Sequence, residues 1–266
     1  TFDRGVYVAN SSGIGHNLQG AINAVPAGTT IHLTAGTYTG NFTIDKRIVL
    51  DGAGSGSNAA ANTILQSASG NTPVITVTAG GLDATNRLTI KDLRVTGATG
   101  GENPGAGILV AGSTAIGHLT LDNVASVSNQ GAGIAFNNTA GIADVAISGA
   151  TIQNNGNAGI RIASAVPSFI GLSVGDTLVS GNATSGFSYN PSGTLSNVGT
   201  GFDFTNVTFT NNSTAGVTNA HDVSIFGFHG DASLTNVTVN SGNGAAANSN
   251  SYGILFTNAS AYAAAG

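Results

Sequence analysis

The sequence predicts an all-β solenoid, in which the chain winds into coils that stack on one another. The first sign is a phrase of glycine, an aliphatic or aromatic residue, any residue and another apolar residue, which returns about every 26 residues in mid-chain. Such a period is typical of units that bury their apolar face only against neighbouring units. The phrase begins at Gly107, Gly133, Gly159, Gly186 and Gly253, with a weaker copy at Gly216-Val217.

The second sign is a pair of short runs in each coil in which apolar and polar residues alternate. Alternation with turn residues between the runs indicates strands rather than helices. With the glycine phrase, these runs give three strands per coil. The first runs are Leu88-Thr89-Ile90, Leu119-Thr120-Leu121, Val145-Ala146-Ile147, Leu172-Ser173-Val174 and Phe202-Asp203-Phe204, and the second include Val207-Thr208-Phe209 and Val237-Thr238-Val239.

The third sign is the residue type at the corners between the runs. Asn, Asp and Gly tolerate left-handed backbone angles, and they recur after the first run of each coil. Coils stacked about 4.8 Å apart also allow their amides to hydrogen-bond to one another. The corners are Asp92, Asn123, Gly149, Asp176, Asn206 and Asn236, and a second expected polar file is Asn129, Asn154, Asn182 and Asn211.

The N-terminal part differs from the repeats. A short strand is expected within residues 1–10, followed by a helix over residues 17–25 with Asn17 as its N-cap and Pro26 and Gly28 after its end. We expect one domain over residues 1–266, with the strand and capping helix at 1–28, the coils at 29–258 and a tail at 259–266. The apolar stripe of the helix is Leu18, Ala21, Ile22 and Val25.

The composition excludes several classes of protein. Charged residues make up 7% of the chain and the net charge is -5, so the basic surface that nucleic acid requires is missing. No apolar run is long enough to span a membrane. The absence of cysteine excludes disulfides and thiolate metal sites. Methionine is also absent, even at position 1, so we expect a processed or excised chain that is secreted or displayed at a cell surface.

The N-terminal third resembles the opening segment of the pectin-lyase-like superfamily of right-handed parallel β-helices. The matching residues include Asn17-Leu18-Gln19-Gly20-Ala21-Ile22, Gly36-Thr37-Tyr38, Phe42-Thr43-Ile44 and Leu50-Asp51-Gly52. The resemblance implies a right-handed parallel β-helix capped by the helix. That group includes polysaccharide-active enzymes and bacterial surface proteins, and the matching segment does not distinguish between them.

The enzymatic motifs of the superfamily are incomplete or missing. Gly201-Phe202-Asp203-Phe204 matches only part of the pectin-esterase segment Gly-x-x-Asp-Phe-x-x-Gly. The Asp-Pro-His motif of alginate epimerases does not occur. Gly117-His118-Leu119 is not the Gly-His-Gly of polygalacturonases. No cofactor and no metal site are predicted.

Asp203 is the first candidate site residue. It lies between two phenylalanines in an alternating strand, so it points outward if they fill the core. An outward aspartate there is either a catalytic acid or nucleophile, or a solvated carboxylate on a polar face.

The second candidate is a cluster in the longest coil. Imidazoles beside carboxylates can bind a metal or perform acid–base chemistry, and neighbouring aromatic rings can stack on a sugar. The alternative is a projecting loop whose histidines are merely exposed. The cluster consists of His221, Asp222, Phe226, Phe228, His229 and Asp231.

The third candidate is Arg161, the one Arg or Lys after residue 94. It lies between two isoleucines and should point outward, where Asp144 and Asp176 on adjacent coils can complete a lyase-like site. A structural ion pair is the simpler interpretation. The other bases, among them Lys46, Arg47, Lys91 and Arg94, either hold an acidic polysaccharide or pair with Asp45, Asp51, Asp83 and Asp92.

Two hypotheses about function follow. The first is a non-catalytic extracellular module, a surface adhesin or self-assembling structural protein that binds a glycan or joins copies end to end. The second is a lyase, esterase or epimerase that acts on an acidic glycan. An enzyme should have an outer groove where acids, bases and exposed aromatic residues converge across adjacent coils.

Overall fold

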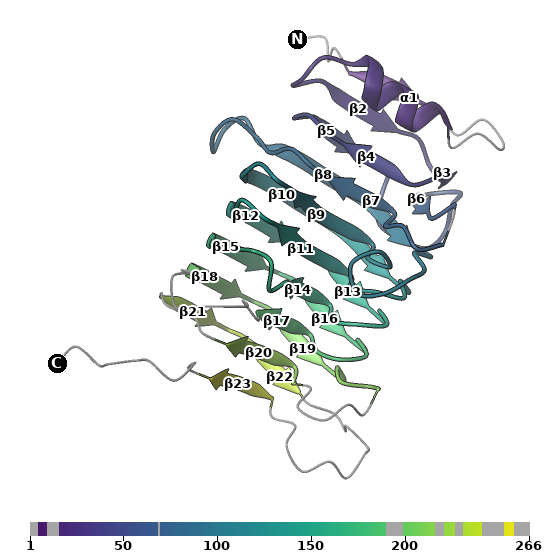
Figure 1. Cartoon of the computed structure of the whole chain (residues 1–266). Helices are drawn as coiled ribbons and strands as arrows, with labels where there is room; N and C mark the ends of the chain where they lie inside the picture. Colours follow the sequence, from purple (N-terminus) through teal and green to yellow (C-terminus); the bar gives the residue numbers. More distant parts are fainter. Residues whose placement is uncertain are drawn as a thin grey trace.

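The computed structural model describes residues 5–9, 16–68, 70–189, 199–215, 221–226, 231–240 and 253–257. Its coils stack into an elongated right-handed parallel β-helix with the N-terminal helix at one end (Figure 1). Every pairing between named strands in these ranges is parallel. The predicted fold class is confirmed, and it is the fold that the resemblance to pectin-lyase-like proteins implied.

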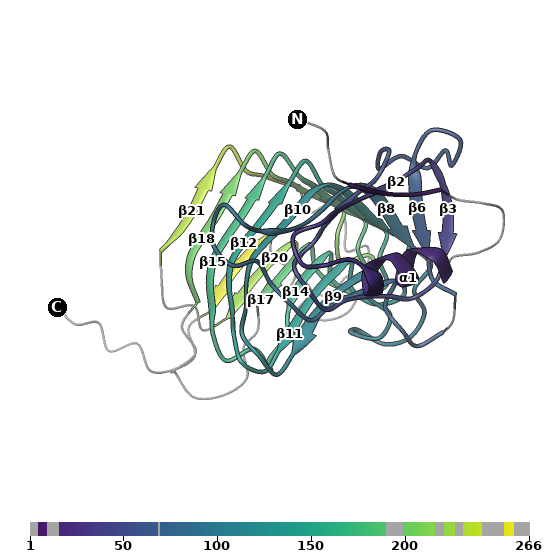
Figure 2. The same ribbon diagram turned by 90° about the horizontal axis from the view of Figure 1, so that it is seen from above.

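The coils pass through three walls of strands, and two of these walls face each other across the interior (Figure 2). The long wall contains β1 (Val6–Val8), β2 (Thr30–Leu33), β5 (Val49–Asp51), β8 (Leu88–Thr96), β10 (Ile116–Val127), β12 (Ile142–Ser148), β15 (Phe169–Gly175), β18 (Gly199–Thr205) and β21 (Ala232–Thr235). The short wall contains β3 (Gly36–Thr39), β6 (Thr63–Gln66), β13 (Thr151–Gln153), β16 (Leu178–Ser180), β19 (Thr208–Thr210) and β22 (Thr238–Asn240), and β8 and β10 extend into it. The glycine wall, opposite the long wall, contains β4 (Phe42–Ile44), β7 (Ile75–Val77), β9 (Ile108–Gly112), β11 (Ile134–Asn138), β14 (Ile160–Ile162), β17 (Phe187–Tyr189), β20 (Val223–Phe226) and β23 (Ile254–Thr257).

The single helix of the described residues, α1 (His16–Ala24), covers the N-terminal end of the solenoid. It begins and ends one residue before the predicted limits, so Asn17 lies in its first turn rather than at the N-cap. Leu18 and Ile22 are fully buried in the core, as the apolar stripe predicts. The helix thus closes the first coil, whose apolar interior would otherwise face water.

The core consists of inward side chains stacked in register from coil to coil. On the glycine wall Ile134 pairs with Ile108 and Ile160, and Ile160 pairs with Phe187. All four are fully buried. Aromatic rings fill the middle coils edge to face, for example Phe136 against Phe169 with ring centroids 5.1 Å apart.

A buried ladder of asparagine side chains explains the recurring glycine. Nδ2 of Asn129, Asn155 and Asn182 donates to Oδ1 of Asn155, Asn182 and Asn212 at 3.1, 2.9 and 2.9 Å. A Cβ atom on Gly159 would lie 2.8 Å from Asn182 Nδ2 and 2.6 Å from Val179 Cγ1. The glycine is therefore required by the ladder packed against it.

The structure corrects the predicted file at two places. Asn155 and Asn212 carry the ladder, whereas Asn154 and Asn211, one residue earlier, adopt left-handed angles with φ of 54° and 52°. Neighbouring asparagines made the two positions indistinguishable by residue type alone.

The predicted corner file forms a second, exposed ladder. Asn123, Asn206 and Asn236 all have positive φ, and their Nδ2 atoms donate to Asp92, Asp176 and Asn206 at 2.7, 2.9 and 2.8 Å. The prediction of left-handed corners with bonded side chains is confirmed there.

The glycine position is occupied by Asp222 in the coil of β20. Phe187 N donates to Asp222 O at 2.8 Å, as Ile160 N donates to Gly186 O at 2.8 Å in the preceding coil. The weaker copy at Gly216-Val217 was therefore a wrong assignment, because the strand of this coil starts at Val223.

At the opposite end from α1, the last described coil is open. Leu234 and Ile254 are 41% and 38% exposed, although their partners Phe204 and Val223 are buried. No described strand pairs with the outer edge of β21, β22 or β23.

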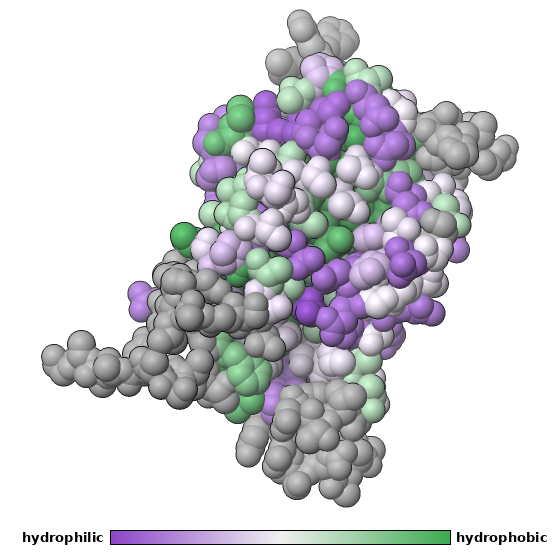
Figure 3. Space-filling view, in the orientation of Figure 1, coloured by the Kyte–Doolittle hydropathy of each residue, from purple (hydrophilic) through white to green (hydrophobic). Residues whose placement is uncertain are grey.

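The face seen in Figure 3 has a hydrophilic area around α1 and small mixed patches elsewhere.

Candidate functional site

The outer face of the long wall has a kink at one position of four consecutive coils. His118, Asp144, Gly171 and Gly201 have φ of 55°, 49°, 73° and 68°. Each is the one residue left unpaired between two paired neighbours, and the strand register is the same on both sides of it. Two coils carry a titratable side chain at the kink, and the next two carry glycine.

The side chains at this kink meet in a charged cluster. His118 Nδ1 and Arg87 Nη1 each lie 2.5 Å from Asp144 Oδ2. Arg87 also donates to Thr120 Oγ1 at 2.6 Å and to the carbonyl oxygens of Leu119 and Asp144 at 2.9 and 2.8 Å. The guanidinium is therefore fixed by its own chain on several sides.

The hydrogen bond from Arg87 lowers the pKa of Asp144 below its usual value, and His118 acts in the same direction. Asp144 is consequently an anion at neutral pH. Its side chain is 42% exposed, so the carboxylate remains accessible to solvent beside the two glycines.

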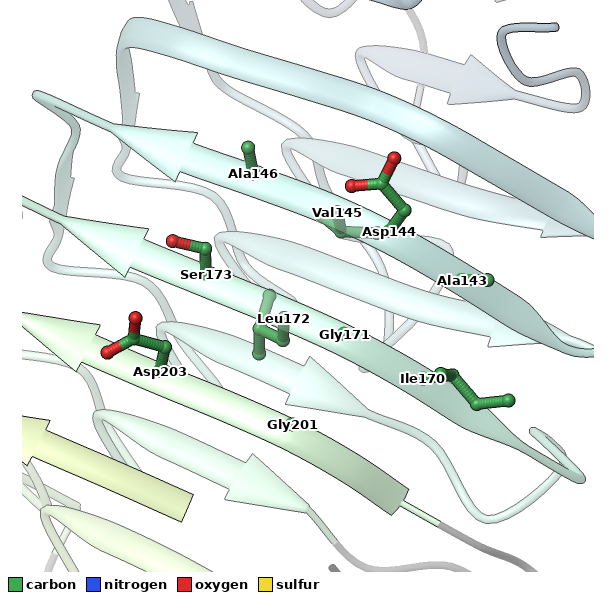
Figure 4. A pocket seen from close by; sticks show the side chains of 10 residues that line it. All are labelled: Ala143, Asp144, Val145, Ala146, Ile170, Gly171, Leu172, Ser173, Gly201 and Asp203. Carbon is green, nitrogen blue, oxygen red and sulfur yellow. The ribbon is translucent and has the colours of Figure 1, made fainter. Parts of the chain in front are cut away.

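Next to this cluster lies a groove of about 310 Å³ across β12, β15 and β18. Asp144 and Asp203 are its acidic residues, and Ser173 lies on the strand between them (Figure 4). Gly171 and Gly201 provide no side chain, which leaves the space open. The remaining lining residues are Ala143, Val145, Ala146, Ile170 and Leu172.

The groove combines polar and apolar surface. Ile170 is 49% exposed at one side, whereas the Ser173 hydroxyl and the Asp203 carboxylate project from neighbouring strands. This pairing of a hydrocarbon surface with hydrogen-bond acceptors suits a ligand that has both hydroxyl groups and C–H faces.

Asp203 points outward, as predicted, while Phe202 and Phe204 are each 1% exposed in the core. Within the described residues its side chain receives a hydrogen bond from Thr205 Oγ1 at 3.2 Å and forms no ion pair. Its catalytic role stays a prediction. Asp203 lines the same groove as Asp144, so the groove contains two carboxyl groups.

The lyase-like site around Arg161 is not assembled. Arg161 pairs with Glu102 at 2.6 Å and donates to Asn103 Oδ1 at 2.9 Å, an ion pair like the one that the simpler interpretation expected. Asp144 pairs with Arg87 instead, and Asp176 accepts from Asn206 in the corner ladder.

The cluster in the longest coil is only partly within the described residues. His221 and Asp222 are 1% and 2% exposed, which does not fit the alternative of a projecting loop at these two positions. Phe226 is half-buried at the end of β20, and Asp231 is exposed before β21. Phe228 and His229 lie outside the described residues.

Asp222 ends the buried asparagine ladder. Its Oδ1 accepts from Asn212 N and Nδ2 at 3.3 and 2.7 Å, the same two groups that the next asparagine would satisfy. Burial raises the pKa of this carboxyl above its usual value. The residue thus completes the buried hydrogen-bond network of the ladder.

Two of the N-terminal bases, Lys46 and Lys91, pair within the chain, as one of the two interpretations proposed, whereas Arg47 and Arg94 form no ion pair among the described residues. Lys91 Nζ lies 2.9 Å from Asp51 and 3.5 Å from Asp92, and Lys46 lies 4.0 Å from Asp45. Asp83 instead accepts hydrogen bonds from Thr85 and Asn86.

Sequence reasoning missed the grouping of Arg87, His118 and Asp144. The available signal was a column: the residue directly before each first alternating run is Arg87, His118, Asp144, Gly171 and Gly201 in successive coils. This column of charged and titratable residues, followed by two glycines, marks both the cluster and the adjacent groove.

The described residues contain neither a metal-ligand cluster nor a membrane-spanning helix. No group of three or more His, Cys, Asp or Glu side chains is placed to hold a metal ion in these ranges. None of the described helices is long and apolar enough to cross a membrane.

Comparison with known proteins gave structural likenesses only. No protein-family profile and no curated protein sequence matches the chain. The fold is similar to that of an alginate lyase from Paenibacillus sp. str. FPU-7, with a TM-score of 0.44 and 16% identity over 94% of this chain and 97% of that one. It is also similar to the pectate lyase Pel9A, with a TM-score of 0.41 and 19% identity over 87% of this chain and 60% of that one.

Proposed function

We propose that this protein is a non-catalytic, glycan-binding β-helix that acts outside the cell or at its surface. The observation that carries the proposal is the groove on the long wall, with Asp144, Ser173 and Asp203 as polar groups and Ile170 as an apolar surface. Carboxylates and hydroxyls form hydrogen bonds with sugar hydroxyls, and an aliphatic side chain packs against the C–H face of a sugar.

The charge of the groove favours a glycan that has no carboxylates of its own. Asp144 is an anion, and its charge is compensated by Arg87, whereas Asp203 has no cation partner among the described residues. A uronate chain would therefore meet an uncompensated negative charge, within a protein whose net charge is -5. We accordingly expect neutral polysaccharides to bind better than alginate or polygalacturonate.

The pKa shifts and ion pairs of the charged groups favour binding over catalysis. A general acid needs a carboxyl whose pKa is raised toward neutrality. Asp144 at the groove has a lowered pKa, and the carboxyl with a raised pKa, Asp222, is buried in the asparagine ladder. Arg87 and Arg161 are both held in ion pairs of their own chain.

The test is affinity electrophoresis of the full chain in gels that contain neutral or acidic polysaccharides. Galactomannan, xylan and hydroxyethyl cellulose represent the neutral class, and alginate and polygalacturonate the acidic class. We expect retardation in at least one neutral gel, reduced by Asp203→Ala and unchanged by Asp45→Ala, a matched change at an exposed position outside the groove. Absence of retardation in every gel, or equal retardation of both variants, would contradict the proposal.

A second candidate function rests on His118. Its Nδ1 is held by the Asp144 carboxylate, the arrangement that orients an imidazole for general-base catalysis. This observation supports a lyase, esterase or epimerase. The check is product formation from the same polysaccharides: turnover that is lost in His118→Gln would favour the enzyme over the binding module. End-to-end self-assembly stays a prediction, which light scattering of the full chain can test.

A further inference from the structure

A stacked pair of rings, Tyr7 and His32, lies on the same outer face at the N-terminal coils. The ring of Tyr7 stacks on that of His32, with centroids 4.7 Å apart and 19° between the ring planes. Tyr7 is nevertheless 69% exposed, so the ring face turned away from His32 is open to solvent. An exposed aromatic ring held by a stacking neighbour is a suitable platform for the C–H face of a sugar.

The platform is held in place by a chain of polar contacts. His32 Nδ1 lies 3.0 Å from Asp51 Oδ2, and Lys91 Nζ lies 2.9 Å from Asp51 Oδ1. Asp51 is 17% exposed, so this arrangement is partly shielded from water. His32 is thereby fixed under the tyrosine ring, which lowers the conformational freedom that binding would otherwise remove.

The strand register places the platform and the groove on one continuous surface. The outward file that starts at the platform pairs Tyr7 with His32, His32 with Asp51, Asp51 with Lys91, and Lys91 with Asp122. The file that reaches the groove lies two residues earlier on the same strands and pairs Thr89, Thr120, Ala146, Ser173 and Asp203. Residues two apart on a strand share a face.

The distance between the two surfaces follows from the sheet. Tyr7 is on β1 and Ser173 on β15, six strand steps apart in the order β1-β2-β5-β8-β10-β12-β15. At about 4.8 Å per step they are separated by roughly 29 Å. Only an extended chain of several sugars can contact both.

We infer that the long wall binds an extended polysaccharide parallel to the solenoid axis, with the groove as one contact and the Tyr7–His32 stack as a second. The inference rests on the proposed function, since it assigns the far end of the same glycan. The side chains between the two contacts include the hydroxyls of Thr89 and Thr120 and the paired charges of Asp51 and Lys91, which can form hydrogen bonds with the sugars that pass over them.

Calorimetry with the full chain measures the affinity for short and long fragments of one neutral polymer. The polymer is the one that retards the protein most in affinity electrophoresis. Long fragments should bind more tightly than short ones. Tyr7→Ala should weaken binding of long fragments by about threefold to tenfold, the range of an aromatic contact, and leave short fragments unaffected. Tyr7→Trp should restore the affinity for long fragments.

The control is Leu82→Ala, which removes another exposed apolar side chain (73% exposed) and should change neither affinity. Melting temperatures of all variants check that they fold. If long and short fragments bind equally, or if Tyr7→Ala weakens both equally, the second contact is wrong while groove binding stands. If Asp203→Ala has no effect on short fragments, the proposed groove itself is wrong.

Discussion

Asp222 meets two requirements of the fold, one with its backbone and one with its side chain. It occupies the backbone position that glycine holds in the neighbouring coils, and its side chain accepts the hydrogen bonds of Asn212. A carboxylate on the glycine position thus accepts the hydrogen bonds that an asparagine of the next coil accepts elsewhere in the ladder.

The raised pKa of Asp222 gives the first stability prediction. Because the folded state holds the proton more tightly than the unfolded state, the contribution of Asp222 is greatest below its unfolded pKa and falls as pH rises through its folded pKa. Asp222→Asn keeps an acceptor for Asn212 and removes the charge, so it should stabilise the protein on the order of 1 kcal/mol at neutral pH.

Chemical unfolding at about pH 4 and about pH 8 is the measurement, because stability between these values should fall less in Asp222→Asn than in the parent. Asp45→Asn, at an exposed carboxyl, serves as the control. An unchanged pH dependence in Asp222→Asn would show that the buried carboxyl does not titrate as described.

The glycine wall shows, at the level of the element, what the sequence could and could not predict. The phrase at Gly159 predicted both the strand and its buried Ile160, because the inward residue follows the glycine at a fixed place. It did not predict Asp222, because the role of a carboxylate at a glycine position depends on Asn212, which belongs to the ladder that joins neighbouring coils. Contacts between coils are not visible in the pattern of one coil.

The requirement for glycine on this wall is itself testable. Gly159→Ala would place a Cβ 2.6 Å from Val179 Cγ1 and 2.7 Å from Gly186 O, and we expect a loss of about 1–3 kcal/mol in the free energy of unfolding. Gly20→Ala, in the exposed middle of α1 with no atom within 4 Å of the added methyl, should instead stabilise by about 0.5–1 kcal/mol. Denaturant unfolding measures the free energy of unfolding of both variants. If Gly159→Ala changed it in the same direction and to the same extent as Gly20→Ala, close packing around Gly159 would not be the reason for the glycine.

Across the whole molecule, stability depends on contacts between adjacent coils. A charge in a middle coil should therefore disrupt both neighbours. Ile160→Asp buries an unpaired carboxylate among Ile134 and Phe187, and we expect it to prevent folding, whereas Ile160→Val should cost about 0.5–1.5 kcal/mol. Circular dichroism with thermal melting measures both. A soluble, β-rich Ile160→Asp protein with the parent's melting temperature would contradict the assignment of this residue to the core.

The architecture was predictable from the sequence because its signals repeat, whereas the candidate site was not. Alternating runs and corner residues recur in coil after coil, so an ambiguous assignment in one coil is corrected by the equivalent positions in the others. The site joins Arg87, His118 and Asp144 from three coils, and each of them occurs once. Asp203 was found because its strand alternates clearly, but its neighbours across the groove required the register between β12, β15 and β18.

The shared kink of the long wall has an evolutionary consequence. At His118, Asp144, Gly171 and Gly201 the backbone takes the same left-handed turn whether the residue is an imidazole, a carboxylate or a bare glycine. The same backbone conformation therefore accommodates different side chains at this column. A new recognition surface can arise here by point substitution, without rebuilding a loop or shifting a coil.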